Sequence, residues 1–378
     1  MYGIIFHPPK FLTNYFSYTL HIYFVNIFLN NLPPNFPIFA KTAIPIMRNL
    51  FIITILAIVA STCMSTQAGS TEVTTESIDS SIAVIGWFNK RDTLTYWINQ
   101  SEWKIKGTDT IKNTGVSTQV MVTVTDSTPD GYAMEYTFLN FKGDSLADTE
   151  LGNYQNRIVE KIGKKIIGTT IKFHTDEYGS IESFDNLKQI KKQAKSLFKA
   201  SMKELTALPI VDSLKNIGFD IKPYIKRVDT DQLVEGYVEE LKLLFLCHGS
   251  IYDRGESTVH EDETETQYAS DTYTSASIDE ESGIYQIVCQ IDNEIPQEAL
   301  KNIVGALVED IDNDEIKDSF NKNFASQVSG GTLTSTYAAV YFPDGWPSDV
   351  IKQTRTTIGN TSKIEQTTIT WDYRSVGH

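Results

Sequence analysis

Runs of β-branched and aromatic residues, separated by tight-turn signals, constrain the fold of this chain more than any other feature. The run 116–125 reads Val-Ser-Thr-Gln-Val-Met-Val-Thr-Val-Thr, and Pro129-Asp130-Gly131 separates it from the alternating run 132–138. β-Branched residues fit a pleated strand, and a Pro-Asp-Gly sequence reverses the chain over a few residues. Together with the alternating segment 93–105, these runs predict a three-stranded antiparallel meander.

Helix and strand patterns alternate along the rest of the chain. Apolar residues recur at helical spacing over 154–167, 185–205, 231–246 and 296–324. Strand patterns lie between them, as a hairpin at 171–184, exposed and paired strands at 257–291, and closing strands at 332–342, 349–358 and 363–371. Asp185 is the expected N-cap of the second helix. Antiparallel groups of strands, interrupted by helices that must cover one face, predict a single α+β domain over 86–378.

A secretory signal pattern begins at residue 47 rather than at the start of the chain. Met47-Arg48-Asn49 precedes an apolar run over 50–60, which small and polar residues follow to Ala68. A short cationic start, an apolar run too brief to span a bilayer and a small-residue exit are typical of a signal peptide. We therefore interpret 47–68 as a signal peptide and the Ser/Thr-rich segment 69–85 as a flexible leader.

Residues 1–46 precede this signal and admit two interpretations. Export signals normally lie at the true N-terminus, which favours a spurious extension translated upstream of residue 47. The alternative is a membrane helix over 15–32, which would place His21 and three asparagines in hydrocarbon, where each is costly. In either case the fold is expected to begin after residue 68.

The signal peptide has two candidate exits. Thr66-Gln67-Ala68 carries small residues at both positions that signal peptidase reads, which predicts a soluble protein beginning at Gly69. The run 59–63 instead resembles a bacterial lipobox, in which Cys63 would be lipidated. A lipobox normally has Gly, Ala or Ser where Thr62 stands, so we favour the soluble form.

The charge balance excludes some classes of partner. Residues 1–68 carry three cations and no Asp or Glu, so their removal changes the formal net charge from −15 to −18. A protein this acidic is repelled by nucleic acids and by anionic membrane surfaces. We expect neither as a direct partner and expect no transmembrane span in the mature protein; the pattern leaves the oligomeric state open.

Two cysteines, Cys247 and Cys289, remain beyond the signal peptide. An oxidising compartment would permit a disulfide between them. Both lie in apolar contexts, Leu-Leu-Phe-Leu-Cys and Tyr-Gln-Ile-Val-Cys, so two separate buried thiols are an equal alternative.

No pattern of metal ligands or catalytic residues stands out. The EF-hand-like start at 310–314 lacks the glycine and the final acid that such a loop needs, and we interpret it as a solvated helix surface. Neither Gly-x-Ser-x-Gly nor His-Glu-x-x-His occurs. Adjacent acids such as Glu239-Glu240 are expected on exposed faces, and Cys247 is expected to be a buried thiol rather than a partner of His248. The sequence therefore predicts no enzyme, no cofactor and no metal site.

Aromatic residues gather in the first meander. One set of them would line an apolar cavity between the sheet and the helices: Trp97, Trp103, Tyr136 and Phe138. The alternative, which we favour, is an ordinary core, because aromatic side chains mostly serve burial.

The order of elements resembles the half-barrel of LolA/LolB-type lipoprotein carriers, a curved antiparallel sheet with helices packed on its concave face. The Gly-Trp-Pro turn at 345–347, followed by two Thr-rich strands, resembles secreted Bacteroidetes proteins of unknown function. These resemblances imply an α+β half-barrel and a protein that is periplasmic or associated with the outer membrane of a Gram-negative bacterium.

Two functions follow as expectations. The first is an exported, non-enzymatic binding or carrier protein that holds an apolar or amphipathic ligand, such as a lipid, between sheet and helices. The second is a structural or interaction protein of the cell envelope that uses exposed strand edges or the acidic surface and binds no small molecule.

Labelling with a palmitate analogue distinguishes the two exits. We expect no incorporation at Cys63 and a mature N-terminus at Gly69, because Ala68 fits signal peptidase and Thr62 does not fit a lipobox. Cys63→Ser serves as the matched control for labelling. Incorporation that the control abolishes would establish the lipid anchor instead.

Overall fold

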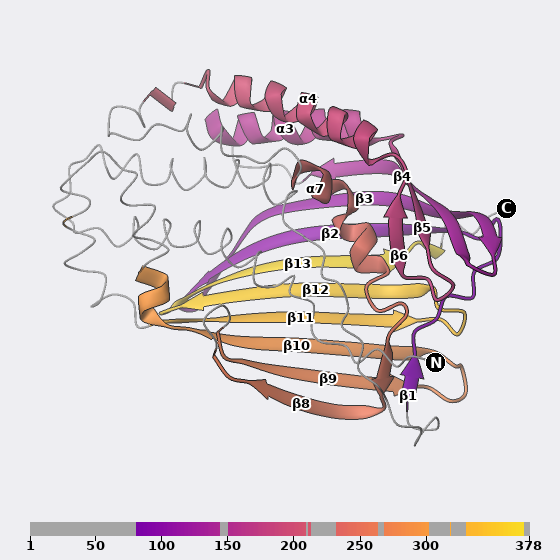
Figure 1. Ribbon diagram of the computed structural model, residues 1–378. Coiled ribbons are helices and arrows are strands. Elements are labelled where there is room, and N and C mark those ends of the chain that lie inside the picture. The colour runs from indigo at the N-terminus through magenta and orange to yellow at the C-terminus, as the bar shows by residue number, and fades with distance from the viewer. Residues whose placement is uncertain are drawn as a thin grey trace.

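The fold is built on one large open antiparallel sheet with helices along one side (Figure 1). The computed structural model describes residues 81–143, 150–208, 211–212, 232–263, 268–301, 318 and 330–373. Within these ranges the sheet has eleven strands in the order β6-β5-β4-β3-β2-β13-β12-β11-β10-β9-β8. The strands are β2 Thr93–Lys106, β3 Asp109–Thr128, β4 Gly131–Gly143, β5 Thr170–Thr175, β6 Ile181–Phe184, β8 Gly255–Glu261, β9 Ser270–Ile278, β10 Tyr285–Ile295, β11 Gly331–Tyr341, β12 Pro347–Ile358 and β13 Thr361–Trp371.

Two meanders meet at the centre of this sheet. Strands β2 to β6 form one half, in chain order from the centre to the edge. Strands β8 to β13 form the other half, in chain order from the edge to the centre. Their junction is the pairing of β2 with β13, in register from Tyr96 opposite Trp371 to Lys106 opposite Thr361. The predicted first meander, the 171–184 hairpin and the three closing strands are all confirmed.

The described helices lie on the same side of the sheet (Figure 1). They are α3 Glu150–Ile166, α4 Leu187–Leu205 and α7 Gln232–Leu244. The ring of Tyr237 on α7 lies edge-to-face with Phe138 of β4, 6.3 Å between centroids, and Gly163 of α3 lies against Phe141. We call the sheet face that these helices cover the inner face. The predicted α+β class and the cover of one sheet face by helices are confirmed, and the sheet is open, with β6 and β8 at its two edges.

The ordered domain begins earlier than the sequence indicates. Ser81–Ala83 forms the short strand β1, which pairs with β7, Ile251–Asp253. Val84 is fully buried and its N–H donates to the Ser250 carbonyl at 3.0 Å. The expected flexible leader, 69–85, is therefore wrong for its last five residues, because this segment gains a strand partner distant in sequence. The interpretations of 1–46, 47–68, 69–80 and Cys63 lie outside the described residues.

Buried aromatic rings close one end of the inner face. Trp346, in the turn between β11 and β12, is 2% exposed, and its ring centroid lies 4.2 Å from that of Phe88. Phe245, just after α7, packs edge-on against both rings. The Nε2–H of His248 donates to the Gly345 carbonyl at 3.0 Å. The Gly-Trp-Pro turn thus connects the sheet to the segment that follows α7.

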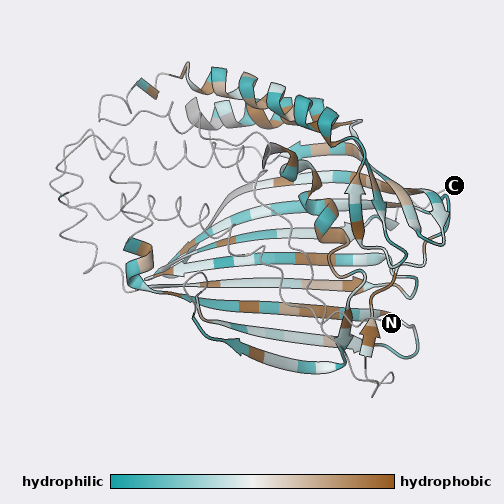
Figure 2. Ribbon diagram, viewed as in Figure 1, coloured by the Kyte–Doolittle hydropathy of each residue, from teal (hydrophilic) through white to brown (hydrophobic). Residues whose placement is uncertain are grey.

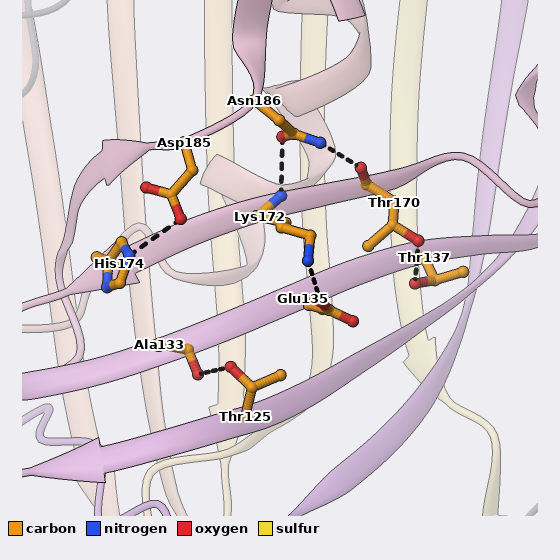
Figure 3. Close-up of polar contacts among 9 residues, drawn as sticks. All are labelled: Thr125, Ala133, Glu135, Thr137, Thr170, Lys172, His174, Asp185 and Asn186. Atoms are coloured by element: carbon orange, nitrogen blue, oxygen red, sulfur yellow. Dashed lines mark hydrogen bonds and ion pairs between the residues drawn. The ribbon is translucent and has the colours of Figure 1, made fainter. Parts of the chain in front are cut away.

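Polar contacts fix the start of α4 on strand β5 (Figure 3). The Asn186 amide donates to the Thr170 carbonyl at 2.8 Å, and its oxygen accepts from the Lys172 N–H at 3.0 Å. Asn186 occupies the N-cap position, so the prediction of Asp185 as the cap is wrong by one residue. Asp185 instead forms a hydrogen bond with His174 of β5, with 3.0 Å between the carboxylate oxygen and Nε2.

The predicted helix after Pro296 begins at Gln297 and is described only to Lys301. The remainder of that prediction, to residue 324, lies outside the described residues, as does the EF-hand-like segment 310–314.

Gly345→Ala is expected to destabilise the fold strongly. Gly345 has φ +84°, and a Cβ there would collide with the backbone carbonyl of Ile85. We expect the free energy of unfolding to fall by about 2–4 kcal/mol, because left-handed strain adds to overpacking.

Gly359→Ala is the matched control for this substitution. Gly359 also has positive φ, +55°, but a Cβ would meet nothing within 4 Å. The expected loss is about 1 kcal/mol, from strain alone. Denaturant unfolding measures both variants, and equal losses would contradict the assigned role of the Gly345 turn.

Candidate functional site

The inner face changes from apolar to polar along its strands. One row, in register across five strands, consists of Ile98, Ile369, Val350, Ala339 and Ile287. The adjacent row, two positions away on each strand, is Gln100, Thr367, Lys352, Tyr337 and Cys289. The row after that, in the same direction across the face, is Glu102, Glu365, Thr354, Ser335 and Ile291. Residues two apart on a strand share a face. Figure 2 shows brown positions on these strands towards the end that α7 overlies.

Helix α7 places two carboxylates on this polar row. Glu239 pairs with Lys352 of β12, 3.1 Å between Nζ and the carboxylate oxygen. Glu240 accepts from the side-chain amide of Gln100 on β2 at 2.7 Å. Because β13 separates β2 from β12 in the sheet, the two contacts bridge three strands.

The prediction that Glu239 and Glu240 lie on an exposed face is wrong. Only 17% of the Glu239 side chain is exposed, and Glu240 is partly buried. Val238 and Leu241, which flank the pair, are buried. The sequence carries a signal for this placement. Val238 and Leu241 are apolar and must face the core, so the acidic pair between them turns towards the boundary of that core.

Glu240 has an unusual proton affinity. Burial raises the pKa of Glu240 to about 7, and the negative charge of Glu239 adds to the rise. Lys352 and the Gln100 amide oppose this increase in pKa without cancelling it. The carboxyl group therefore exchanges its proton near neutral pH.

Two buried tyrosine hydroxyls between the sheet and α7 have no hydrogen-bond partner among the described residues. Tyr136 and Tyr237 are 1% and 7% exposed, and both hydroxyl oxygens are buried and unpaired. Burial raises the pKa of Tyr136, and the charge of Glu240 raises it further, so this hydroxyl lies within the field of the carboxylate. A buried, unpaired hydroxyl costs about 1–3 kcal/mol. Two such groups, one of them within the field of a partly buried acid, mark a candidate binding site.

A buried lysine lies further along the inner face, on β13. Lys363 contacts Glu365 at 2.7 Å and Glu102 at 3.2 Å, and only 8% of its side chain is exposed. Burial lowers the pKa of Lys363, but the two carboxylates outweigh that effect and the net pKa is raised. Lys363 therefore stays charged, with two carboxylates around one ammonium group.

Buried hydroxyls lie on the same face, in the row of Glu365 and two and four strands away from β13. Thr272 and Ser335 flank Ile291 in register on β9 and β11, and both hydroxyl oxygens are buried and unpaired. The polar half of the inner face thus carries hydrogen-bonding capacity that the described residues do not use.

Cys247 and His248 do not form a nucleophile–base pair. Burial lowers the pKa of His248 to about 4, so the ring is neutral, and its Nε2–H is engaged by Gly345. Burial raises the pKa of the Cys247 thiol, which contacts the hydroxyls of Tyr252, Tyr341 and Tyr337.

Both cysteines of the domain are free thiols in the structure. Burial raises the pKa of Cys289 to about 11, and the charge of Cys247 adds to the rise, which places the two sulfur atoms within electrostatic range. Their disulfide stays a prediction.

The four aromatic residues predicted to line a cavity divide between the two faces of the sheet. Tyr136 and Phe138 lie on the inner face, edge-to-face with centroids 5.2 Å apart. Trp97 and Trp103 occupy the opposite parity to the inner-face residues of β2. The Trp97 indole N–H donates to Asp372 at 2.9 Å on that outer face. The structure therefore brings together only half of the predicted set.

Other kinds of site find little support in the described ranges. No group of three or more His, Cys, Asp or Glu residues there is arranged to hold a metal ion. None of the helices in the same ranges is long and apolar enough to cross a membrane.

Comparisons with known proteins give a general likeness to a solved structure. No family model and no curated protein sequence matches the chain. Among solved structures, a lipovitellin chain from a study named "Lipid-protein interactions in lipovitellin" matches with a TM-score of 0.34 and 12% sequence identity. The match covers 75% of this chain and 25% of the lipovitellin chain, so this chain spans about a quarter of that length. A likeness at this TM-score assigns no function.

Glu240→Gln is expected to stabilise the protein at alkaline pH. Because the folded-state pKa is raised from 4.5 to about 7, the folded state binds this proton more tightly than the unfolded state. Wild-type stability therefore falls, through this group, as the pH rises from about 4.5 to about 7. We expect the variant to be about 1–2 kcal/mol more stable than wild type near pH 8 and no more stable near pH 4.

Urea unfolding at both pH values measures this difference. Glu160→Gln is the control, because Glu160 is exposed on α3 and its contact with Lys164 lowers its pKa. That control should show no gain near pH 8. Absence of a gain for Glu240→Gln would contradict the shielded environment of Glu240.

Proposed function

We propose that this protein is an exported, non-enzymatic binding or carrier protein for an amphipathic ligand held against the inner face beside α7. The observation that carries the proposal is the change from an apolar row at Ile98 and Val350 to a polar row at Gln100 and Lys352 within one helix-covered face. An amphipathic molecule has the same division along its length.

The cost of this polar face supports binding over simple stability. A sheet face covered by helices is most stable when its side chains are apolar, since a buried polar group without a hydrogen bond costs free energy. Here the hydroxyls of Ser335, Thr272, Tyr136 and Tyr237 are buried and unpaired. Groups retained at such a cost are expected to serve a polar ligand.

The state of the reactive residues favours binding over catalysis. His248 is neutral and bonded to a backbone carbonyl, and the Cys247 thiol is protonated among tyrosines. A nucleophile needs a lowered pKa or an adjacent base. Glu240, with its raised pKa, accepts a hydrogen bond from Gln100 and acts on the Tyr136 hydroxyl, neither of which is an activated nucleophile.

A second candidate function rests on the edge strand β8. Every residue from Gly255 to His260 is exposed, and Val259 is 56% exposed. An exposed edge can accept a strand from another protein. Pull-down from envelope extracts, with β8 substituted by proline at Thr258, tests this envelope-interaction role.

Co-purification tests the leading proposal. Native mass spectrometry of the gently purified protein is expected to detect a bound amphiphile, and the delipidated protein should bind a fluorescent fatty-chain probe. We expect Ser335→Leu to weaken probe binding about fivefold or more, because it removes a polar group from the inner face.

Thr336→Leu is the matched control on β11. Thr336 adjoins Ser335 but points to the opposite face, where its hydroxyl contacts Gln290. It should leave probe binding within about twofold of wild type. A protein that is ligand-free as purified and binds no probe would overturn the proposal.

A further inference from the structure

Carboxylates on the inner face differ in how they are neutralised. Glu239 has Lys352 as its ion-pair partner, and Glu102 and Glu365 share Lys363. Glu240 has only the neutral amide of Gln100 as a side-chain donor at hydrogen-bond distance among the described residues. Lys352 acts on Glu240 through its field, but its ion pair is with Glu239. Glu240 is thus a shielded negative charge without a cation of its own.

The unpaired tyrosine hydroxyls between the sheet and α7 are hydrogen-bond acceptors as well as donors. Tyr136 lies within the field of Glu240, and Tyr237 is three residues before it, on the adjacent turn of α7. Phe138 contacts both tyrosine rings, at 5.2 Å and 6.3 Å between centroids, and so connects the two positions. Each hydroxyl oxygen can accept a hydrogen bond that no described residue supplies.

We infer that Glu240 and Tyr136 bind the ammonium group of an amine-bearing amphiphile, with its apolar chain towards the row that contains Ile98 and Val350. This inference rests on the proposed function. An ammonium group presents three donors, and the Glu240 carboxylate and the Tyr136 hydroxyl oxygen can accept two of them.

The charge of the site argues against an anionic headgroup. A carboxylate or phosphate would lie beside Glu240 and Glu239, and a like charge in a shielded site is repelled. Lys352, the cation among the described residues that acts on Glu240, is already paired with Glu239. A neutral alcohol would satisfy the hydroxyls but leave the Glu240 charge uncompensated.

Protons compete with the ammonium group for Glu240. The groups that act on it are Glu239 on α7, Gln100 on β2, Tyr136 on β4 and Lys352 on β12. Since the pKa of Glu240 is about 7, acidification to about pH 5.5 protonates it. The preference for an amine should therefore shrink at that pH.

Calorimetry with three probes of equal chain length tests the inference: dodecylamine, dodecanol and dodecanoate. At pH 7.5 we expect the wild-type protein to bind dodecylamine about tenfold or more tightly than dodecanol, as a charge-assisted hydrogen bond implies. Glu240→Gln should remove that preference, and Tyr136→Phe should reduce it severalfold. Glu235→Gln removes an equal charge from α7 but at a residue paired with Lys242, and should keep the preference.

Each outcome bears on a distinct statement. Equal binding of amine and alcohol by wild type would overturn the ammonium site and leave the proposed function standing, whereas failure to bind any probe would overturn both. A preference that persists in Glu240→Gln, or tighter binding of dodecanoate, would overturn the role given to Glu240. Tyr136→Phe removes an unpaired hydroxyl and is expected to fold. This variant therefore still tests the inference if Glu240→Gln does not fold.

Discussion

The pairing of β2 with β13 is the interaction on which the rest of the structure depends. It joins Tyr96 to Trp371 and Lys106 to Thr361, residues at opposite ends of the described domain, and so merges two meanders into one sheet. Contacts this distant in sequence carry a loop-closure cost that local hairpins do not. Only after they form do Gln100 and Lys352 lie on one face, two strands apart, where a single helix can reach both.

Helix α7 lies at the boundary between the apolar and polar halves of that face. Val238 and Leu241 bury apolar surface, while Glu239 and Glu240 between them turn to β12 and β2. Burial stabilises the helix on the sheet, and the same burial shields Glu240 enough to raise its pKa. Stability and the proposed binding chemistry therefore come from one packing interface rather than from separate parts of the fold.

Local sequence signals predicted the elements well and the site poorly. The alternation at 116–125 and the turn at Pro129-Asp130-Gly131 depend on neighbouring residues only, and both reappear in β3 and β4. Asp185 missed the cap by one position because Asn186 is held by β5, a tertiary contact. The four aromatic residues expected to line a cavity lie on two different faces for another reason. Trp97 follows Tyr96 on β2, and adjacent residues on a strand point to opposite faces.

By itself the sequence determined the α+β class, the succession of most strands along the chain and the helix between β4 and β5, because these follow from periodicity and turn chemistry. Tertiary structure alone decided which side chains share the inner face. Glu240, Gln100 and Tyr136 come from α7, β2 and β4, and no spacing along the chain relates them. Their shared environment exists because β-pairing across the whole domain brings three strands under one helix, and burial then changes the chemistry of a carboxylate that the sequence presents as ordinary surface charge.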